Sequence, residues 1–332
     1  LFLRPIAVLL GAQGAMLEDC VVYGGILLAG QTMFMLQNVF QSFLITAEKP
    51  HFGLGVTVAA GLTNIILDFL FIAVFRWGVA GAAWASVIGQ CIGGILPLFY
   101  FLRPNDSLLR LRRTGLEAAV LLKACFNGSS ELMTNISTSL VGMLYNFQLL
   151  RYTGENGVAG YGVVMYTQMI FAAVFLGYAI GTAPIVSYHY GAGNQGELKN
   201  MLKKSLLVML ASGAVMLLAA WALAAPLSHI FVGYDVGLME MTCHALALYA
   251  FSFILYGINV FTSSFFTALN NGGISAAISF LRTLVFQMAA VLLLPLVLGL
   301  DGIWWAVTVA EVLAFFLSMA FLASKRGQYR YL

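Results

Sequence analysis

Two long apolar runs, at residues 52–75 and 79–102, constrain most strongly what this chain can fold into. Only a short polar break, Arg76-Trp77-Gly78, separates them. Each run exceeds the ~20 apolar residues that a helix needs to cross the hydrocarbon core of a bilayer. The sequence therefore predicts a hairpin of two membrane-spanning helices that turns near Trp77.

A few polar residues interrupt this hairpin at one depth. Asp68 is the only ionisable residue of the first run, and Asn64 precedes it by one helical turn on the same helix face. Asp68 and Ser86 each lie nine residues from Trp77, so both are expected roughly 13–14 Å deep in the membrane. A charge at mid-bilayer costs at least about 2.5–3.5 kcal/mol, and such residues usually line a cavity or carry ions. We therefore interpret Asn64, Asp68 and Ser86 as a cation-binding site; a structural hydrogen bond from Asp68 to a neighbouring helix is the alternative.

Apolar runs recur along the whole chain. Hydrophobic residues make up 61% of it and charged residues 9%, whereas soluble domains contain ~25% charged residues. The fourth run is over-long, and we expect its start, which bears Glu117 and Lys123, to be an amphipathic segment at the membrane surface. The pattern predicts an all-α polytopic membrane protein with nine spans, at residues 20–46, 52–75, 79–102, 116–150, 160–188, 198–224, 241–268, 274–298 and 302–322.

Basic residues are divided unequally between alternate loops, and Lys and Arg mark the cytoplasmic side. The segment at 103–123 and the C-terminus are therefore expected inside the cell. The basic set holds Lys49, Arg103, Arg110, Arg112, Arg113, Lys199, Lys203, Lys204, Lys325, Arg326 and Arg330, and the other set only Arg4, Arg76 and Arg151.

Several function classes find no support in the sequence. The net charge of +3 does not indicate nucleic acid, because the basic residues gather at the ends of apolar runs. The four cysteines are scattered singly and fit neither a disulfide framework nor a metal-ligand spacing. No metal-binding His pair, Gly-rich phosphate loop or nucleophile with its base is visible at membrane depth, so we expect no enzyme and no cofactor.

An internal repeat indicates a duplicated architecture. A shift of 221 positions aligns residues 3–103 with 224–324 without a gap, and matches Asn38-Val39-Phe40 to Asn259-Val260-Phe261. Residues 105–223 then lack partners, which predicts a full protein of two pseudo-symmetric six-helix lobes from which three helices, roughly 115 residues, are missing. We assign 1–103 to the rest of the N-lobe, 104–115 to a cytoplasmic linker, 116–324 to the C-lobe and 325–332 to a cytoplasmic tail.

Three further ionisable residues lie well inside the expected spans of the C-lobe: Glu131, Arg282 and Glu311. Glu131 and Arg282 are expected near one depth, with Glu311 about 9 Å away along the membrane normal. Arg282 should neutralise one or both carboxylates, because an unpaired buried charge is costly. Structural pairing and a direct part in transport are both open. Candidates for lining a substrate cavity, among abundant Met and Phe, are Gln37, Asn38, Asn135, Gln168 and Asn259.

With these features, the sequence resembles the multidrug and toxic compound extrusion (MATE) transporters. The resemblance rests on the segment 184–194, Pro-Ile-Val-Ser-Tyr-His-Tyr-Gly-Ala-Gly-Asn, on Asn64-Ile65-Ile66-Leu67-Asp68, and on the segment 78–86 that ends at Ser86. It implies a V-shaped antiporter that exports cationic, amphipathic compounds while Na⁺ or protons flow inward, with Asn64, Asp68 and Ser86 matching an N-lobe cation site. Two departures stand out: the first-helix Asp of that site would precede this chain, and residues 256–268 hold no tenth-helix acid. Glu131 is near, but not at, the family's seventh-helix acidic position, so no C-lobe sodium site is carried over.

The sequence thus predicts a multidrug efflux antiporter of the bacterial inner membrane, with its C-terminus in the cytoplasm. Its expected partners are the lipid bilayer and small amphipathic or cationic drugs, with no nucleic acid, and a monomer is expected. The coupling ion is Na⁺ or H⁺, and no metal is expected beyond Na⁺ at Asp68. One alternative is a flippase for lipids or lipid-linked precursors, which would need several basic residues in its cavity. A membrane-embedded enzyme or receptor is the remote alternative.

Overall fold

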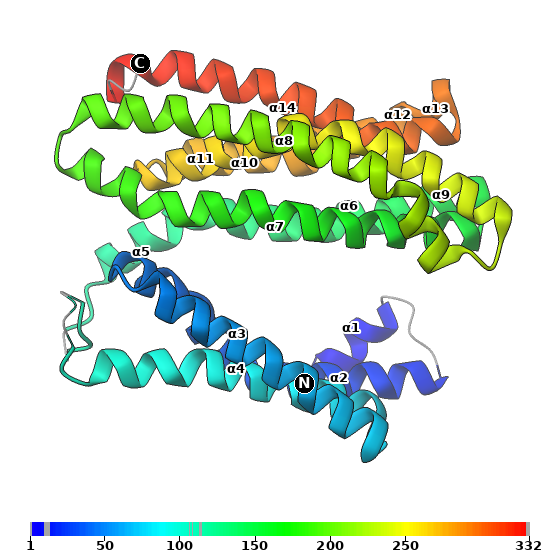
Figure 1. The fold of residues 1–332 in the computed structure, drawn as a ribbon, viewed down its shortest axis with the longest axis horizontal. Coiled ribbons are helices and arrows are strands. Elements are labelled where there is room, and N and C mark those ends of the chain that lie inside the picture. Colours follow the sequence, from blue (N-terminus) through cyan, green and yellow to red (C-terminus); the bar gives the residue numbers. More distant parts are fainter. Residues whose placement is uncertain (1, 10–13, 106, 108, 113–114, 330–332) are drawn as a thin grey trace. The chain divides into compact units, whose positions relative to one another are not determined.

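The computed structural model describes all residues except 1, 10–13, 106, 108, 113–114 and 330–332. Arg113 and Arg330, which the expected orientation uses, lie outside the described residues. Within the described part the chain is helical and contains no strand. It divides into two compact units, Leu1–Gly115 and Leu116–Leu332, with the boundary at the end of the expected linker (Figure 1).

The first unit is a bundle of three long helices and one short helix. Helix α4 packs along both α2 and α3, and α3 continues directly into a segment of π-helix, η1. The elements are α1 (Leu3–Leu9), α2 (Gly14–Thr46), α3 (Pro50–Asp68), η1 (Phe69–Val74) and α4 (Gly78–Leu102).

The hairpin predicted around Trp77 is confirmed by the structure, and the turn residues explain its tightness. Arg76 and Gly78 adopt positive φ angles of 56° and 57°, which glycine accepts at no steric cost. The Trp77 ring stacks on Phe71 with 4.8 Å between centroids. At Gly81 a Cβ would lie 2.9 Å from the Cβ of Phe71, so the two arms meet where only glycine fits.

The second unit is built around α10, whose side chains Phe253, Phe261, Phe265 and Phe266 are almost fully buried. Helices α7, α8, α11 and α14 all pack against α10. The elements are α5 (Ala118–Asn127), α6 (Ser129–Thr153), α7 (Glu155–Gly191), α8 (Gln195–Val232), α9 (Val236–Tyr249), the 3₁₀ turn η2 (Ala250–Ser252), α10 (Phe253–Ala268), α11 (Gly272–Phe280), the π-helix η3 (Leu281–Phe286), α12 (Gln287–Leu293), α13 (Pro295–Leu298) and α14 (Leu300–Tyr329).

The number of spans needs a correction. Eight helical segments of the described chain are long and apolar enough to cross a membrane, where the sequence predicted nine. The difference is the fourth run, which breaks at Gly128 into the short helix α5 and the 25-residue helix α6. Helix α6 has the length of a span, but its first half is rich in Ser, Thr and Asn and is therefore less apolar than the others.

The repeat detected in the sequence is visible in the backbone. Gly78 and Gly299, which the shift of 221 aligns, have φ angles of 57° and 60° and each precedes a long helix. Gly81 and Gly302 are also equivalent, and a Cβ at Gly302 would lie 2.5 Å from the carbonyl oxygen of Leu294. A similar turn, followed by a glycine that packs closely against the preceding arm, therefore occurs in both units.

We predict that Gly302→Ala lowers the free energy of unfolding by about 1–3 kcal/mol, because the added methyl group must push two backbone segments apart. The thermal unfolding midpoint of the purified protein in detergent measures the effect. Gly327→Ala on the same helix is the control, since a Cβ there meets nothing within 4 Å; it should leave the midpoint unchanged or raise it. Equal midpoints for the two variants would contradict the close approach.

Candidate functional site

A cavity of about 310 Å³ opens in the first unit between α2, α3 and α4. Glycines on α4 allow its polar walls to approach: a Cβ at Gly89 would lie 3.2 Å from the Cβ of Asn64, and one at Gly93 would lie 2.6 Å from the amide carbon of Gln37. Two residues of the predicted cation site, Asn64 and Ser86, therefore share one cavity. It is lined by Phe34, Gln37, Thr57, Ala60, Gly61, Asn64, Ser86, Gly89 and Gln90.

Asp68 lies one helical turn beyond Asn64, at the last residue of α3, and is not among the residues that line this cavity. Its Oδ1 atom and the Nδ2 atom of Asn64 are buried and have no hydrogen-bond partner in the structure. No basic side chain of the described chain forms an ion pair with Asp68. Because buried polar groups are nearly always paired, two orphaned atoms one turn apart indicate that a partner is missing.

In the second unit the buried charges of Arg282 and Glu311 are paired with each other. The Nε of Arg282 donates to both carboxylate oxygens of Glu311, at 2.9 and 3.0 Å. The Nδ2 of Asn259 donates to Oε2 of Glu311 at 2.7 Å, and Ser318 donates to the Asn259 side-chain oxygen at 3.1 Å. The Arg282 guanidinium also lies over the Tyr256 ring, 4.5 Å from its centroid. All four hydrogen-bonding side chains are less than one tenth exposed, so the structure confirms the predicted pairing of Arg282 with Glu311.

Asp68 and Arg282 both lie at segments of π-helix. Asp68 immediately precedes η1, and Arg282 is the second residue of η3. A π-helical turn widens the backbone and shifts the register of the side chains that follow, and such turns are frequent at functional positions. The α-helical periodicity used to place side chains from the sequence does not apply within them.

Glu131 lies apart from this network, which corrects its expected depth. Because the run breaks at Gly128, Glu131 falls in the first turn of α6 rather than well inside a span. Its side chain is exposed, and it forms no ion pair with any described residue. Arg282 therefore neutralises one carboxylate of the expected pair, Glu311, and not the other.

A second cavity, of about 210 Å³, lies beside the ion pair. Arg282 and Glu311 line it, as does the predicted substrate residue Gln168. Tyr161 also lines this cavity and was not predicted from the sequence; its ring stacks on Tyr145 with 4.9 Å between centroids and 6° between planes. Thr134 and Thr138 also line this cavity; their spacing of one turn on α6 was the available signal.

Of the other four predicted cavity residues, only Gln37 lines one of these cavities. Asn38 and Asn135 are exposed, and each amide donates to the carbonyl four residues earlier on its own helix, at 2.8 Å. Asn259 is fully buried and binds Glu311, as described above. Gln37 lines the cavity of the first unit.

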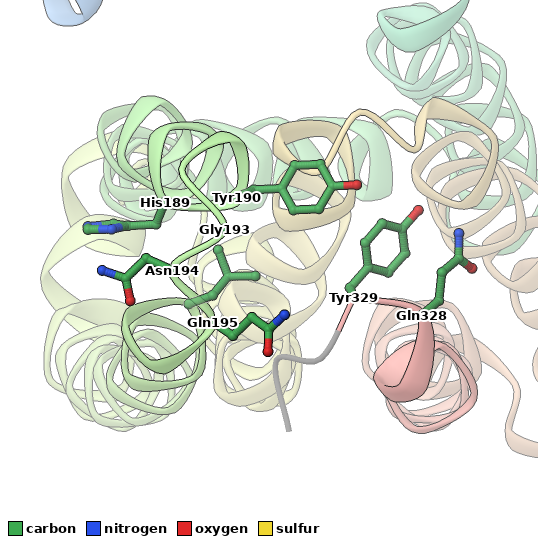
Figure 2. A pocket seen from close by; sticks show the side chains of 8 residues that line it. His189, Tyr190, Gly193, Asn194, Gln195, Gln328 and Tyr329 are labelled. Atoms are coloured by element: carbon green, nitrogen blue, oxygen red, sulfur yellow. The ribbon is translucent and has the colours of Figure 1, made fainter.

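The segment at 184–194 ends α7 and forms the tight turn into α8. Its residues His189, Tyr190, Gly193 and Asn194 line a cavity of about 310 Å³ together with the end of α14 (Figure 2). Asn194 caps α8 by accepting from the backbone N–H of Glu197, and Tyr190 meets Tyr329 edge-on at 5.7 Å. The segment therefore joins α7, α8 and α14 at one end of the second unit.

A helical bundle that crosses a membrane several times and carries polar cavities and buried charges is typical of a membrane transporter. Comparison with known proteins is consistent with that class. A family model described as MatE matches residues 132–292. Multidrug export protein MepA of Staphylococcus saprophyticus is 24% identical over 314 residues, which cover 93% of this chain and 68% of the relative. The MepA protein of a bovine strain of Staphylococcus aureus is 23% identical, with coverage of 94% and 68%.

A solved structure gives the same fold. The outward-facing conformation of a multidrug resistance MATE family transporter of the MOP superfamily superimposes with a TM-score of 0.92 at 21% identity, over 99% of this chain and 74% of that one. The chain thus has the fold of MATE family transporters, and about half of its length matches the family model. It spans about two thirds of the length of the curated relatives.

We predict that Glu311→Gln lowers the free energy of unfolding by about 3–5 kcal/mol, because it leaves the buried Arg282 charge without a counter-ion. The double variant Arg282→Met/Glu311→Gln should lose markedly less, since no charge is then left unpaired. Thermal unfolding in detergent measures both. Asp301→Asn is the control: Asp301 pairs with His244 at 3.0 Å but is half exposed, so its loss should cost at most about 1 kcal/mol. A double variant as unstable as the single one would contradict the charge argument.

Proposed function

We propose that this transporter is a secondary active multidrug exporter that expels amphipathic organic cations in exchange for Na⁺ or H⁺. The relatives named above are called multidrug export proteins, and the fold is that of a MATE transporter. The exchange mechanism and the coupling ion are inferred from the site itself.

One observation carries the proposal: the buried Oδ1 of Asp68 has no partner. A carboxylate out of water needs a counter-charge or a proton, because an isolated ionised group is very costly to bury. Arg282 provides that counter-charge for Glu311, whereas no described side chain provides it for Asp68. A bound Na⁺ or a bound proton would neutralise the Asp68 carboxylate. Release of that ion would again leave the carboxylate charged and without a partner.

The surroundings of Asp68 suit a hard cation. Asn64 and Ser86 contribute an amide and a hydroxyl to the adjoining cavity, and Gln37 and Gln90 add further amides. Oxygen donors of this kind are the ligands that hard cations prefer. The cavity holds no basic side chain, so nothing in its lining opposes the entry of a cation.

The backbone offers a way to couple ion binding to movement. Asp68 is followed at once by η1, whose N–H groups bond to carbonyls five or more residues earlier, as in Phe75 to Leu70 at 2.9 Å. The charge of Asp68 influences which hydrogen-bond pattern the helix adopts next to it. Neutralising this charge would therefore allow η1 to change from the π-helical to another pattern. We propose that ion binding reorders the helix here and lowers drug affinity on the outward-facing side, which gives alternating access.

The nature of the substrate follows from charge and shape. The cavity of the first unit is neutral apart from nearby Asp68, and it combines amide groups with an aromatic wall at Phe34. A positively charged, partly apolar molecule would meet no like charge there and could rest on an aromatic face. A flippase for anionic lipids would instead need several basic residues in the cavity, and the described lining contains none.

We predict that Asp68→Asn abolishes cation-driven efflux, because the amide cannot bind a proton or balance the charge of Na⁺. Efflux of a cationic dye from cells, with protein level and size-exclusion profile measured in parallel, tests this. Glu197→Gln is the matched control: it also removes one negative charge, from an exposed position in the first turn of α8, and efflux should be kept. Unchanged drug resistance in cells carrying Asp68→Asn would reject the assignment.

Ser86→Ala distinguishes the two ions. If Na⁺ is coupled, the lost hydroxyl ligand should raise the Na⁺ concentration for half-maximal efflux several-fold; if H⁺ is coupled, the pH dependence should stay the same, because a proton needs only the carboxylate. The assay uses proteoliposomes in which the Na⁺ and pH gradients are imposed separately. Efflux that needs neither gradient would contradict ion coupling altogether.

A further inference from the structure

A fourth cavity, of about 570 Å³, lies in the first unit at the turn between α2 and α3. It is separate from the site around Asp68: it includes the residue that precedes α3 and the residue that follows α4, so it lies at the ends of these spans. Such ends are where a membrane helix meets the lipid headgroups. The cavity is lined by Lys49, Phe52, Leu96, Phe99, Tyr100, Arg103, Pro104 and Asn105.

The polar end of this cavity is positively charged. Lys49 and Arg103 both line it, and neither forms an ion pair with a described acidic residue. Glu48, the neighbour of Lys49, is exposed and is not part of the lining. The hydroxyl of Tyr100 is buried and has no hydrogen-bond partner. Two cationic side chains therefore line a space to which no acidic side chain of the described residues contributes a counter-charge.

Hydrogen bonds fix the position of Arg103. The side-chain amide of Asn105 donates to the carbonyls of Tyr100 and Arg103, at 3.0 and 3.2 Å. Its side-chain oxygen accepts from the backbone N–H of Ser107 at 2.9 Å, and Arg110 donates to its carbonyl, also at 2.9 Å. These hydrogen bonds fold the chain after α4 back on the end of the helix. They fix the backbone of Arg103 at the edge of the cavity.

The start of α3 adds to the positive potential. Lys49 is the residue at its N-cap, and no side chain caps the helix. Uncapped N–H groups and the helix dipole at this end favour an anion. An anionic group between Lys49 and Arg103 would supply the acceptor that the cap lacks.

The other end of the cavity is apolar and opens along the helix. Leu96, Phe99, Tyr100 and Arg103 follow at i, i+3, i+4 and i+7, so they share one face of α4 over about 10 Å. Leu96 and Phe99 are 45% and 54% exposed. The Phe52 ring packs against Tyr100 with 5.2 Å between centroids and closes the far wall. The cavity is therefore basic at the end of the span and aromatic and aliphatic toward its middle.

We propose that this cavity is a binding site for one anionic phospholipid of the surrounding bilayer. Its phosphate would lie between Lys49 and Arg103, and its first acyl methylenes would lie along Leu96 and Phe99. The two parts of the ligand match the two ends of the cavity in charge and polarity. A free phosphate would leave the apolar wall exposed, and a zwitterionic lipid would leave the second cation unbalanced.

Native mass spectrometry of the chain in detergent, titrated with dioleoyl phosphatidylglycerol or dioleoyl phosphatidylcholine, tests the proposal. The wild type should bind the anionic lipid at least about tenfold more tightly than the zwitterionic one. Lys49→Gln/Arg103→Gln should weaken anionic-lipid binding by about 10- to 30-fold, as expected for two basic residues near a charged headgroup. Phe99→Ser should weaken it several-fold, because the acyl chain loses its contact.

Lys203→Gln/Lys204→Gln is the control, since it removes the same net charge from two exposed positions on α8 that do not line this cavity. It should bind the lipid as the wild type does, and all variants should keep the wild-type size-exclusion profile. Equal loss of binding in both double variants would reduce the effect to overall charge and overturn the proposal. Displacement of the lipid by inorganic phosphate, or full binding by Phe99→Ser, would show that the cavity holds an anion rather than a lipid and would overturn it too.

Discussion

The cost of placing a charge where water is scarce governs this structure. The protein meets that cost in two ways. In the second unit Glu311 is balanced by Arg282 and held by Asn259, so the carboxylate has a permanent counter-ion and a full set of donors. In the first unit Asp68 has neither. A permanently satisfied charge stabilises one arrangement of helices, whereas an unsatisfied one makes stability depend on a ligand. This difference is why we place ion coupling in the first unit.

Each π-helical segment lies at one of these charges, and this is consistent with the same division. The η3 segment carries Arg282 into the interior, where the ion pair fixes its register. The η1 segment follows Asp68, and its register is not fixed by any such pair. A π-helical segment without such an ion pair can change its backbone hydrogen bonds at a small cost in free energy. A segment that carries one side chain of a buried ion pair would have to break that pair to do so. The same local deformation is thus expected to be rigid in one unit and responsive in the other.

Much of this could be predicted from the sequence, because apolar length and charge placement are strong signals in a membrane. The hairpin at Trp77 followed from two apolar runs and the polar break between them, and the common level of Asn64 and Ser86 followed from depth arithmetic. The neutralisation of a carboxylate by Arg282 followed instead from the cost of an unpaired buried charge; depth arithmetic placed Arg282 nearer to Glu131 than to Glu311, its partner in the structure. Glu131 was misplaced because a single glycine, Gly128, ended the helix early. Asn259 was expected at a cavity but is buried, because its role depends on a partner 52 residues away. Periodicity gives the face of a helix, but not which neighbour that face meets.

The repeat shows how one duplicated bundle came to hold two different interiors. With the shift of 221, Arg282 aligns with Gly61 and Glu311 with Gln90, and both Gly61 and Gln90 line the cavity of the first unit. Where the second unit fills this space with an ion pair, the first leaves it open and neutral. Asn259 aligns with Asn38, which lacks a Glu to bind and returns its amide to its own helix. On this alignment, a glycine and a glutamine in the first unit stand where two long charged side chains fill the second, which is one reason why this part of the first unit is an open, neutral cavity.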